Sequence, residues 1–201
     1  REHIQEGIDF GCATVCVNPS AMKVAQQLCE GTSTKICVVC DFPFGLSTTE
    51  SRVLQAREYC KTGYVFELDI VANYGLMKSG LWDEVLFDLT SVIAECHTLK
   101  SAVKVILETD ALNLDEIKKG TEIAIEAGAD FVKTSTGFYT GGPQKGATVE
   151  IISEMLKISK GRAKIKGSGC IRTKEHFMEL IDLGIDRMGV GYRSTPVVLA
   201  D

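Results

Sequence analysis

The sequence predicts an α/β fold in which parallel strands curve into a (β/α)8 barrel, and three observations predict it. Short β-branched runs alternate with longer amphipathic segments along the chain, ionisable residues stand near the ends of many runs, and no G-x-G-x-x-G follows the first run. The alternation indicates right-handed βαβ units and a parallel sheet. The polar strand ends favour a barrel, because its active site forms at the carboxyl ends of its strands. The missing glycine motif weakens the competing interpretation, an open doubly wound sheet that binds a dinucleotide.

Seven runs are expected to form strands, one fewer than a complete barrel has. They are residues 13–19, 35–43, 65–73, 102–109, 130–136, 163–169 and 186–191. We therefore expect the first strand of the barrel to be absent from this sequence. The rest of the chain, residues 1–201, is expected to form a single domain, because nothing in its composition resembles a linker.

The segments between the strands carry helical patterns with recognisable ends. In residues 82–99 apolar side chains recur at helical spacing, at Val85, Leu89, Val92 and Cys96. In residues 174–184 the side chains of Phe177, Leu180 and Ile181 are expected to share one face, with Gly184 ending the helix. Ser47 and Glu50 have the spacing of a capping box at the start of another helix.

Composition and charge are those of an ordinary globular protein. Hydrophobic residues make up 45% and charged residues 24% of the chain. The net charge of −5 argues against a nucleic-acid-binding or anionic-membrane-binding surface, since both usually need a basic face. No apolar run approaches the roughly 20 residues of a membrane helix, and "REHIQEGIDFG" does not have the pattern of a signal peptide. We therefore expect a cytoplasmic protein.

The eight cysteines do not indicate a disulfide framework, because the chain is too long and too apolar for a stapled mini-protein. Six of them lie in apolar stretches, where a free thiol behaves as a small hydrophobe: Cys12, Cys16, Cys37, Cys40, Cys60 and Cys96. Only "CVVC" has C-x-x-C spacing, and no second such pair completes a zinc site. We expect reduced thiols and no metal.

Charged residues inside the expected strands are the main functional signal. A parallel barrel buries both faces of its strands, so a charge within them needs an explanation. Four consecutive runs carry such charges, at Asp69, Lys104, Lys133 and Lys166. Any one of these could be an exposed strand end. Together they indicate a polar cluster in the mouth of a barrel.

Two lysines on adjacent strands suggest covalent chemistry at an amine. An amine is nucleophilic at neutral pH only if its pKa falls from about 10.4, through burial or a nearby cation. Lys166 beside Lys133 is expected to lower the pKa of Lys133 in this way. A carboxylate such as Asp69 would then move protons through a water molecule. The reaction class implied is Schiff-base formation with a carbonyl substrate.

Glycines directly after three strands suggest an anion site. "KTSTGF", "KGSGCIRT" and "MGVGYRS" place Gly137, Gly169, Gly189 and Gly191 where backbone N–H groups can approach a phosphate. In barrels the loops after the last two strands commonly bind phosphate. Arg172 or Arg193 would add positive charge. The alternative is that these are ordinary tight βα turns.

These motifs also carry a family resemblance. "VCVNPS", "FPFGLSTTESRVLQARE", "ELDIVANYGLMKSG", "VKVILET", "EAGADFVKTSTGF", "KGATVE" and "KGSGCIRT" follow one another over nearly the whole chain. In this order they resemble the deoxyribose-phosphate aldolases, class I aldolases with a TIM-barrel fold. The resemblance implies reversible cleavage of 2-deoxy-D-ribose 5-phosphate to acetaldehyde and D-glyceraldehyde 3-phosphate, without a metal or organic cofactor. It also implies small-molecule partners and a homodimer.

The resemblance assigns roles to individual residues. Lys133 matches the Schiff-base lysine, Lys166 the second lysine that perturbs it, and Asp69 the carboxylate of the proton relay. Lys104 matches a lysine of the same polar network, and Cys16 a cysteine beside the pocket. The substrate-binding residues expected from the resemblance and from the glycine loops are Lys104, Cys16, Thr134, Gly137, Gly169, Arg172, Gly189 and Gly191.

The sequence departs from the family pattern in three places. A starting segment similar to "IDHTLLKP" is missing, Gly191 and Tyr192 stand where a phosphate-binding serine turn is usual, and Cys170 replaces a usual glycine. The Cys170 exchange is expected to change the orientation of the backbone amides in its loop. Two alternatives follow from these departures: a related class I aldolase for another sugar phosphate, and a non-catalytic ligand-binding barrel.

Overall fold

The computed structural model describes residues 1–200 and contains one sheet of seven parallel strands in the order β1-β2-β3-β4-β5-β6-β7. The strands are β1 (Thr14–Val17), β2 (Lys35–Cys40), β3 (Val65–Val71), β4 (Ala102–Ile106), β5 (Phe131–Lys133), β6 (Lys164–Ser168) and β7 (Arg187–Gly189). Each strand pairs with the next one along the chain. This order excludes the doubly wound alternative, in which the strand order reverses. The expectation of seven strands is confirmed.

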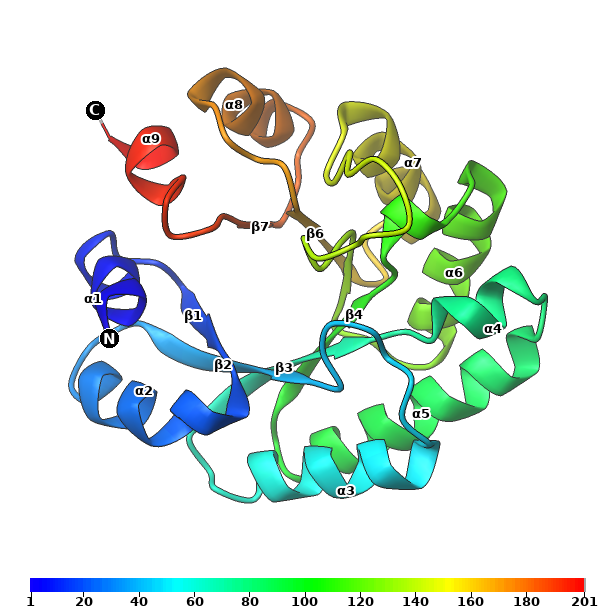
Figure 1. Cartoon of the computed structure of the whole chain (residues 1–201), viewed down its shortest axis with the longest axis horizontal. Helices are drawn as coiled ribbons and strands as arrows, with labels where there is room; N and C mark the ends of the chain where they lie inside the picture. Colours follow the sequence, from blue (N-terminus) through cyan, green and yellow to red (C-terminus); the bar gives the residue numbers. More distant parts are fainter. Residues whose placement is uncertain (201) are drawn as a thin grey trace.

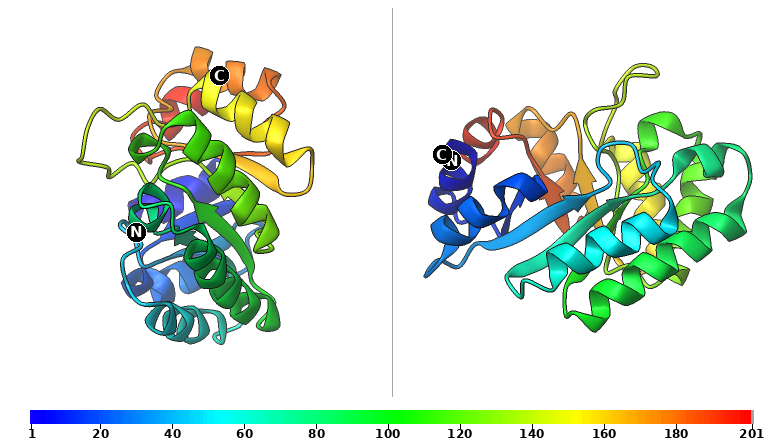
Figure 2. Two further views of the ribbon diagram at one scale, coloured as in Figure 1. Left: turned by 90° about the vertical axis from the view of Figure 1, so that its right-hand side faces the viewer. Right: turned by 60° about the horizontal axis from the view of Figure 1, so that its bottom comes forward.

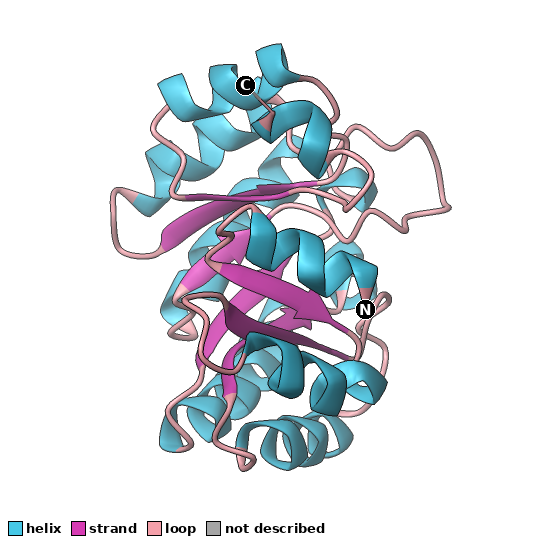
Figure 3. Ribbon diagram, turned by 90° about the vertical axis from the view of Figure 1, so that its left-hand side faces the viewer, coloured by secondary structure: helices cyan, strands magenta, loops and turns pink. Residues whose placement is uncertain are grey.

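Helices follow the strands and cover the outer face of the sheet (Figures 1 and 3). They are α1 (Glu2–Asp9), α2 (Met22–Cys29), α3 (Thr49–Cys60), α4 (Tyr74–Lys78), α5 (Trp82–Thr98), α6 (Leu114–Glu126), α7 (Val149–Ser159), α8 (Lys174–Asp182) and α9 (Thr195–Leu199), with short 3₁₀ turns at Pro19–Ala21 and Thr109–Ala111. None of the helices within residues 1–200 has the length and apolar character needed to cross a membrane.

The sheet curls into a TIM barrel that is open on one side. In residues 1–200, β1 pairs only with β2 and β7 pairs only with β6, so the two edge strands do not meet. Figure 1 shows the opening between them, flanked by α1 and α9. A cavity of about 390 Å³ lies in this opening, with Val15 and Met188 among its lining residues. The structure thus has the fold class that the sequence predicts, with seven strands.

The helix expected over residues 82–99 is α5, and its predicted apolar face is buried at Val85, Leu89, Val92 and Cys96. The prediction for residues 174–184 is only partly right. Leu180 of α8 is buried, but Ile181 is 44% exposed and lies beside the barrel opening, where no strand covers it. Gly184 follows the end of α8 with φ +83°, the left-handed conformation that glycine adopts most easily.

The predicted capping box at Ser47 is wrong by one residue. Thr48 is the N-cap of α3, and its side chain accepts a hydrogen bond from the Ser51 N–H. The Ser47 backbone N–H and hydroxyl instead donate to the two carboxylate oxygens of Asp41, at 2.9 and 2.8 Å. Ser47 therefore stabilises the loop after β2, and the helix begins one residue later than the spacing suggests.

Candidate active site

Asp69, fully buried in the middle of β3, is the centre of a cluster of three lysines. Its Oδ1 accepts a hydrogen bond from Lys104 Nζ at 2.8 Å. Its Oδ2 accepts one from Lys133 Nζ at 2.7 Å and lies 3.6 Å from Lys166 Nζ. Strand register produces this arrangement, because Asp69 is paired with Lys104 and Lys133 is paired with Lys166. The four charged strand residues predicted to cluster therefore do so.

Burial and ion pairing act in opposite directions on these groups. Burial raises the pKa of Asp69, but the three lysines outweigh it and hold that pKa well below its usual value. Burial lowers the pKa of Lys133, but the charges of Asp69 and Cys16 raise it above the usual value overall. Burial also lowers the pKa of Lys166, and here the weaker contact with Asp69 does not compensate, so this pKa stays below the usual value.

The expected direction of the pKa shift at Lys133 is therefore wrong for the unliganded site. Repulsion between Lys133 and Lys166 is present, but it acts on two amines with unequal contacts to Asp69. The shorter contact, at 2.7 Å, keeps the proton on Lys133, and the longer one, at 3.6 Å, leaves Lys166 the weaker base. In the resting site Lys166 is thus the amine that loses its proton first.

A cavity of about 650 Å³ opens above this cluster at the carboxyl ends of the strands. Lys133 and Lys166 are 6% and 5% exposed, and both line the cavity. Six further expected site residues also line it: Cys16, Gly137, Gly169, Arg172, Gly189 and Gly191. The cavity walls also include residues that the sequence analysis did not single out, namely His3, Phe42, Thr136, Phe138 and Ser194.

Two expected substrate-binding residues do not line the cavity. Lys104 is fully buried behind Asp69, where it also forms an ion pair with Glu67. Thr134 is fully buried, and its hydroxyl donates to the Ser168 carbonyl at 2.7 Å and accepts from the Ser168 N–H at 2.9 Å. Thr134 therefore joins the end of β5 to the end of β6, and its position does not support a contact with substrate.

The loops after β6 and β7 form one wall of the cavity and keep the geometry that glycines permit. Cys170 has φ +58°, so it adopts the left-handed conformation that a glycine would take at this place. This glycine-like conformation does not support the expectation that Cys170 changes the orientation of the backbone amides in its loop. After β7, Ser194 also reaches the cavity, so a hydroxyl lies near the loop that was expected to lack one.

Cys37 is a further site residue to which the sequence analysis assigned no role. It lies on β2, is fully buried, and its thiol donates to Asp69 Oδ1 at 3.1 Å. Lys104 Nζ lies 3.3 Å from the same sulfur. The neighbouring Cys40 of "CVVC" faces Arg52 on the outer side, with a 3.9 Å contact from its sulfur to the Arg52 carbonyl. The alternation of faces along a strand could have separated these two cysteines.

The sulfurs of Cys16 and Cys37 and a carboxylate oxygen of Asp69 lie within 4.8 Å of one another. Such a donor set can suit a soft metal ion. Here, however, three lysine nitrogens lie within 3.6 Å of the same carboxylate. Their positive charge opposes a cation at this point, so the arrangement is better suited to anionic or carbonyl ligands.

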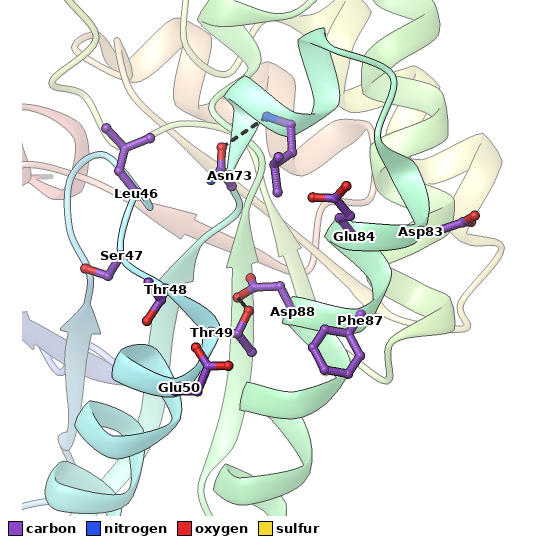
Figure 4. Close-up of a pocket in the computed structure, with 11 residues that line it drawn as sticks. Leu46, Ser47, Thr48, Thr49, Glu50, Asn73, Asp83, Glu84, Phe87 and Asp88 are labelled. Carbon is purple, nitrogen blue, oxygen red and sulfur yellow. Dashed lines mark hydrogen bonds between the residues drawn. The ribbon is translucent and has the colours of Figure 1, made fainter.

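A second cavity, of about 580 Å³, lies between the N-terminal ends of α3 and α5, close to Asn73 at the start of α4 (Figure 4). Glu50 and Glu84 are in the first turns of their helices, where a negative charge is favourable for the helix dipole. Asp88 accepts a hydrogen bond from Thr49 at 2.8 Å and pairs with the buried Arg52. These acidic residues are explained by the packing of the helices.

Comparison with known proteins matches this geometry to a family. The model of the DeoC/LacD family aldolases matches residues 1–191. The chain belongs to the DeoC/LacD aldolase family. Deoxyribose-phosphate aldolase from Dictyoglomus turgidum is 43% identical over 92% of this chain and 81% of the relative, and that from Aquifex aeolicus is 42% identical over 94% and 82%.

Solved structures agree with this membership in the DeoC/LacD family. The tetrameric deoxyribose phosphate aldolase from Aeropyrum pernix superposes with a TM-score of 0.85 and is 26% identical, over 98% of this chain and 80% of that one. The residues that the family model matches, 1–191, include all seven strands. The family resemblance and the TIM-barrel fold expected from the sequence are confirmed.

Proposed function

We propose that this DeoC/LacD family member is a class I aldolase that reversibly cleaves 2-deoxy-D-ribose 5-phosphate to D-glyceraldehyde 3-phosphate and acetaldehyde. The observation that carries the proposal is the approach of Lys133 and Lys166 to one oxygen of Asp69 at the floor of a cavity. The relatives at 42% and 43% identity, which are deoxyribose-phosphate aldolases, support the choice of substrate.

Lys133 is proposed as the nucleophile. Its free amine adds to the aldehyde carbon of the open-chain sugar, and loss of water gives a protonated imine, which accepts the electron pair of the breaking carbon–carbon bond. As that bond breaks, the C3 hydroxyl gives its proton to the relay of Asp69 and Lys166, and D-glyceraldehyde 3-phosphate leaves with an aldehyde at this carbon. The enamine that stays on Lys133 takes a proton at carbon, and water then releases acetaldehyde and restores the amine.

Proton movement is proposed to run through Asp69. Lys133 must give up a proton before it attacks, and Asp69 Oδ2 contacts both Lys133 and Lys166. Because its pKa is lowered, Lys166 is the amine that can accept this proton. Lys104 holds the other carboxylate oxygen and fixes the orientation of Asp69.

The phosphate group is proposed to bind at the wall formed by the loops after β6 and β7. Gly169, Gly189 and Gly191 bring backbone close to this wall, and Arg172 and Ser194 line it with a charge and a hydroxyl. This places the phosphate on one side of Lys166. The aldehyde end of the sugar is then directed toward Lys133.

Borohydride trapping tests the proposal. The protein is incubated with acetaldehyde and reduced, and peptide mass mapping is expected to find a stable ethyl adduct on Lys133. Lys133→Ala should lose the adduct, and its cleavage of deoxyribose 5-phosphate, followed by coupled oxidation of glyceraldehyde 3-phosphate, should fall more than about a thousandfold. Lys157→Ala, at an exposed lysine of α7, is the matched control and should keep both.

Two results would contradict this proposal in different ways. An adduct at Lys133 with turnover only of another sugar phosphate would support a related class I aldolase. A protein that forms no adduct and turns over no sugar phosphate would be a ligand-binding barrel.

We further propose that the protein acts in the cytoplasm in carbohydrate and deoxyribonucleotide catabolism, as one domain that forms a homodimer. The continuous sheet supports the single domain. The relative from Aeropyrum pernix is a tetramer, which supports self-association of this chain but not the number of subunits proposed here. Sedimentation of the purified chain would give the number of subunits.

A further inference from the structure

Two thiols lie side by side at the edge of the lysine cluster. Cys16 on β1 and Cys37 on β2 are partners in strand register, and their sulfurs lie within 4.8 Å of each other. Neighbouring strands are about 4.8 Å apart. That spacing falls within the range of Cα separations, about 4.4–6.8 Å, that a disulfide bridges. A bond between the two sulfurs thus requires rotation of the side chains rather than movement of the backbone.

The two thiols differ in ionisation and in access. The neighbouring Cys37 thiol, aided by the charges of Lys133 and Lys166, lowers the pKa of the Cys16 thiol to about 7 against the opposing effects of burial and Asp69. Burial, together with the neighbouring Cys16 thiol, raises the pKa of Cys37. Cys16 lines the 650 Å³ cavity, whereas Cys37 is fully buried beneath it. Cys16 is therefore the accessible thiol and the one that ionises more easily, and Cys37 is the buried thiol that keeps its proton.

A second close pair of thiols in the chain lacks such access. Cys60 and Cys96 share a hydrogen bond, and both are buried under α3 and α5, 1% and 0% exposed. Neither lines any of the cavities described above. The chain thus contains one thiol pair that opens to a cavity and one that does not, and the second serves as an internal control.

We propose that Cys16 and Cys37 form a peroxide-reactive dithiol site, in which Cys16 is the attacking thiolate and Cys37 the resolving thiol. An accessible thiolate of low pKa beside a second cysteine is the arrangement of reversible thiol oxidation. Disulfide formation does not depend on the aldolase reaction. Only the expected loss of turnover rests on the proposed function.

The chemistry balances with hydrogen peroxide as the oxidant. The Cys16 thiolate attacks one peroxide oxygen, the O–O bond breaks, and the products are a sulfenic acid on Cys16 and, after protonation, one water. Cys37 then attacks the sulfur of the Cys16 sulfenic acid, and the S–O bond of that acid breaks. The hydroxide that leaves takes up the proton of the Cys37 thiol and forms a second water. Two thiols are thereby oxidised and one peroxide is reduced. A small dithiol restores both thiols by exchange.

Oxidation would alter the carboxylate at the centre of the site. In the reduced protein the Cys37 thiol donates to Asp69 Oδ1 at 3.1 Å, and the Cys16 sulfur lies 3.9 Å from Asp69 Oδ2. A disulfide has no S–H group, so Asp69 Oδ1 loses the hydrogen bond from Cys37. Asp69 would then be held only by the three lysines, and turnover is expected to fall.

The test treats the full chain with one equivalent of hydrogen peroxide and maps its peptides. Trypsin is expected to release residues 2–23 joined to residues 36–52, with the loss of two hydrogen atoms, and dithiothreitol should separate them. Each peptide contains a second cysteine, Cys12 or Cys40. Fragmentation of the joined peptides identifies the linked sulfurs without any variant. The Cys60–Cys96 pair should stay reduced.

Variants sharpen the assignment. Cys12→Ser and Cys40→Ser should keep the linkage, whereas Cys37→Ser should lose it and leave a sulfenic acid on Cys16 that dimedone traps. Turnover of the wild type should fall in proportion to the linked fraction and return with dithiothreitol. A linkage through Cys12 or Cys40, or peroxide-treated protein in which Cys16 stays a free thiol, would overturn the proposal. Linkage with unchanged turnover would overturn the predicted effect on Asp69.

Discussion

Lys133 and Lys166 reach the same oxygen atom, Asp69 Oδ2, at distances of 2.7 and 3.6 Å. This inequality decides which of the two amines holds its proton more tightly. The shorter contact with Asp69 stabilises the charged form of Lys133. Lys166 is also buried but has only the longer contact with Asp69, so its neutral form is favoured. The two lysines are therefore an acid and a base that share one carboxylate.

Replacing Lys166 should change the pH dependence of turnover as well as its rate. Neutral Lys166 is the proposed base, so the rate should rise with pH as Lys166 loses its proton, below the usual lysine range because its pKa is lowered. Lys166→Leu leaves only Lys133, whose pKa is raised. We expect a loss of about 10²–10⁴-fold in kcat and an acid limb that moves to higher pH. A pH–rate profile of both proteins measures the shift.

The matched control is Lys164→Leu, two residues earlier on β6, where the lysine is exposed. It should leave both the rate and the profile unchanged. If the acid limb of the pH–rate profile lies at the same pH in Lys166→Leu and in the wild type, the limb reports the ionisation of a group other than Lys166.

Asp69→Asn should lower stability as well as activity. The substitution leaves the buried ammonium groups of Lys104 and Lys133 without their shared carboxylate, and uncompensated buried charges cost about 3–5 kcal/mol. The depressed pKa of Asp69 means that its contribution is present above about pH 4 and is lost as the pH falls through the lower folded-state value. In urea unfolding, the free energy of unfolding should therefore be much lower for the variant than for the wild type at pH 7. This difference should become smaller below about pH 4.

An exposed ion pair provides the comparison for Asp69. Glu95 accepts from Arg57 at 2.8 Å on the surface, and Glu95→Gln should cost less than about 1 kcal/mol. If Asp69→Asn lowered the free energy of unfolding no more than Glu95→Gln does, the stability of the lysine cluster would not depend on the carboxylate.

The sequence is sufficient to predict the charged cluster but not the pKa values within it. Two general rules place Asp69, Lys104, Lys133 and Lys166 together: side chains alternate between faces along a strand, and a parallel barrel buries both faces of its sheet. Both rules can be applied to the amino-acid sequence without a structure. The direction of the pKa shift at Lys133 depends on a difference of less than 1 Å between two contacts with Asp69. Such a difference is set by packing, which no periodicity encodes.

Loop residues were the hardest to assign, because their roles depend on contacts distant in sequence. Thr134 has the appearance of a ligand-binding hydroxyl in "KTSTGF", yet it binds the backbone of Ser168, 34 residues away. Glu108 lies within the strand expected over residues 102–109, and the sequence analysis assigned it no role, whereas β4 ends at Ile106. Its role becomes visible only when the loop after β5 is seen to pass over it.

Glu108 and Asp110 hold both ends of the long loop between β5 and α7, which extends beyond the barrel (Figure 2). Glu108 is 1% exposed with φ +58°, an unfavourable conformation for a residue other than glycine, and its carboxylate accepts hydrogen bonds from the N–H and hydroxyl of Thr136. Asp110 Oδ1 accepts from the N–H groups of Lys145 and Gly146, at 2.8 and 2.9 Å.

We predict that Glu108→Ala loosens this loop and lowers kcat/KM by roughly 10–100-fold, because Thr136 and Gly137 border the cavity next to Lys133. Glu108→Gln keeps an oxygen acceptor for Thr136 and should restore most of the activity. Burial raises the pKa of Glu108, so the ionised carboxylate is a cost to folding at neutral pH, and the uncharged Gln should not lower the melting temperature. Chymotrypsin cleavage at the exposed Phe138 should be faster in Glu108→Ala than in Glu108→Gln. Equal cleavage and equal kcat/KM in the two variants would mean that the carboxylate does not hold the loop.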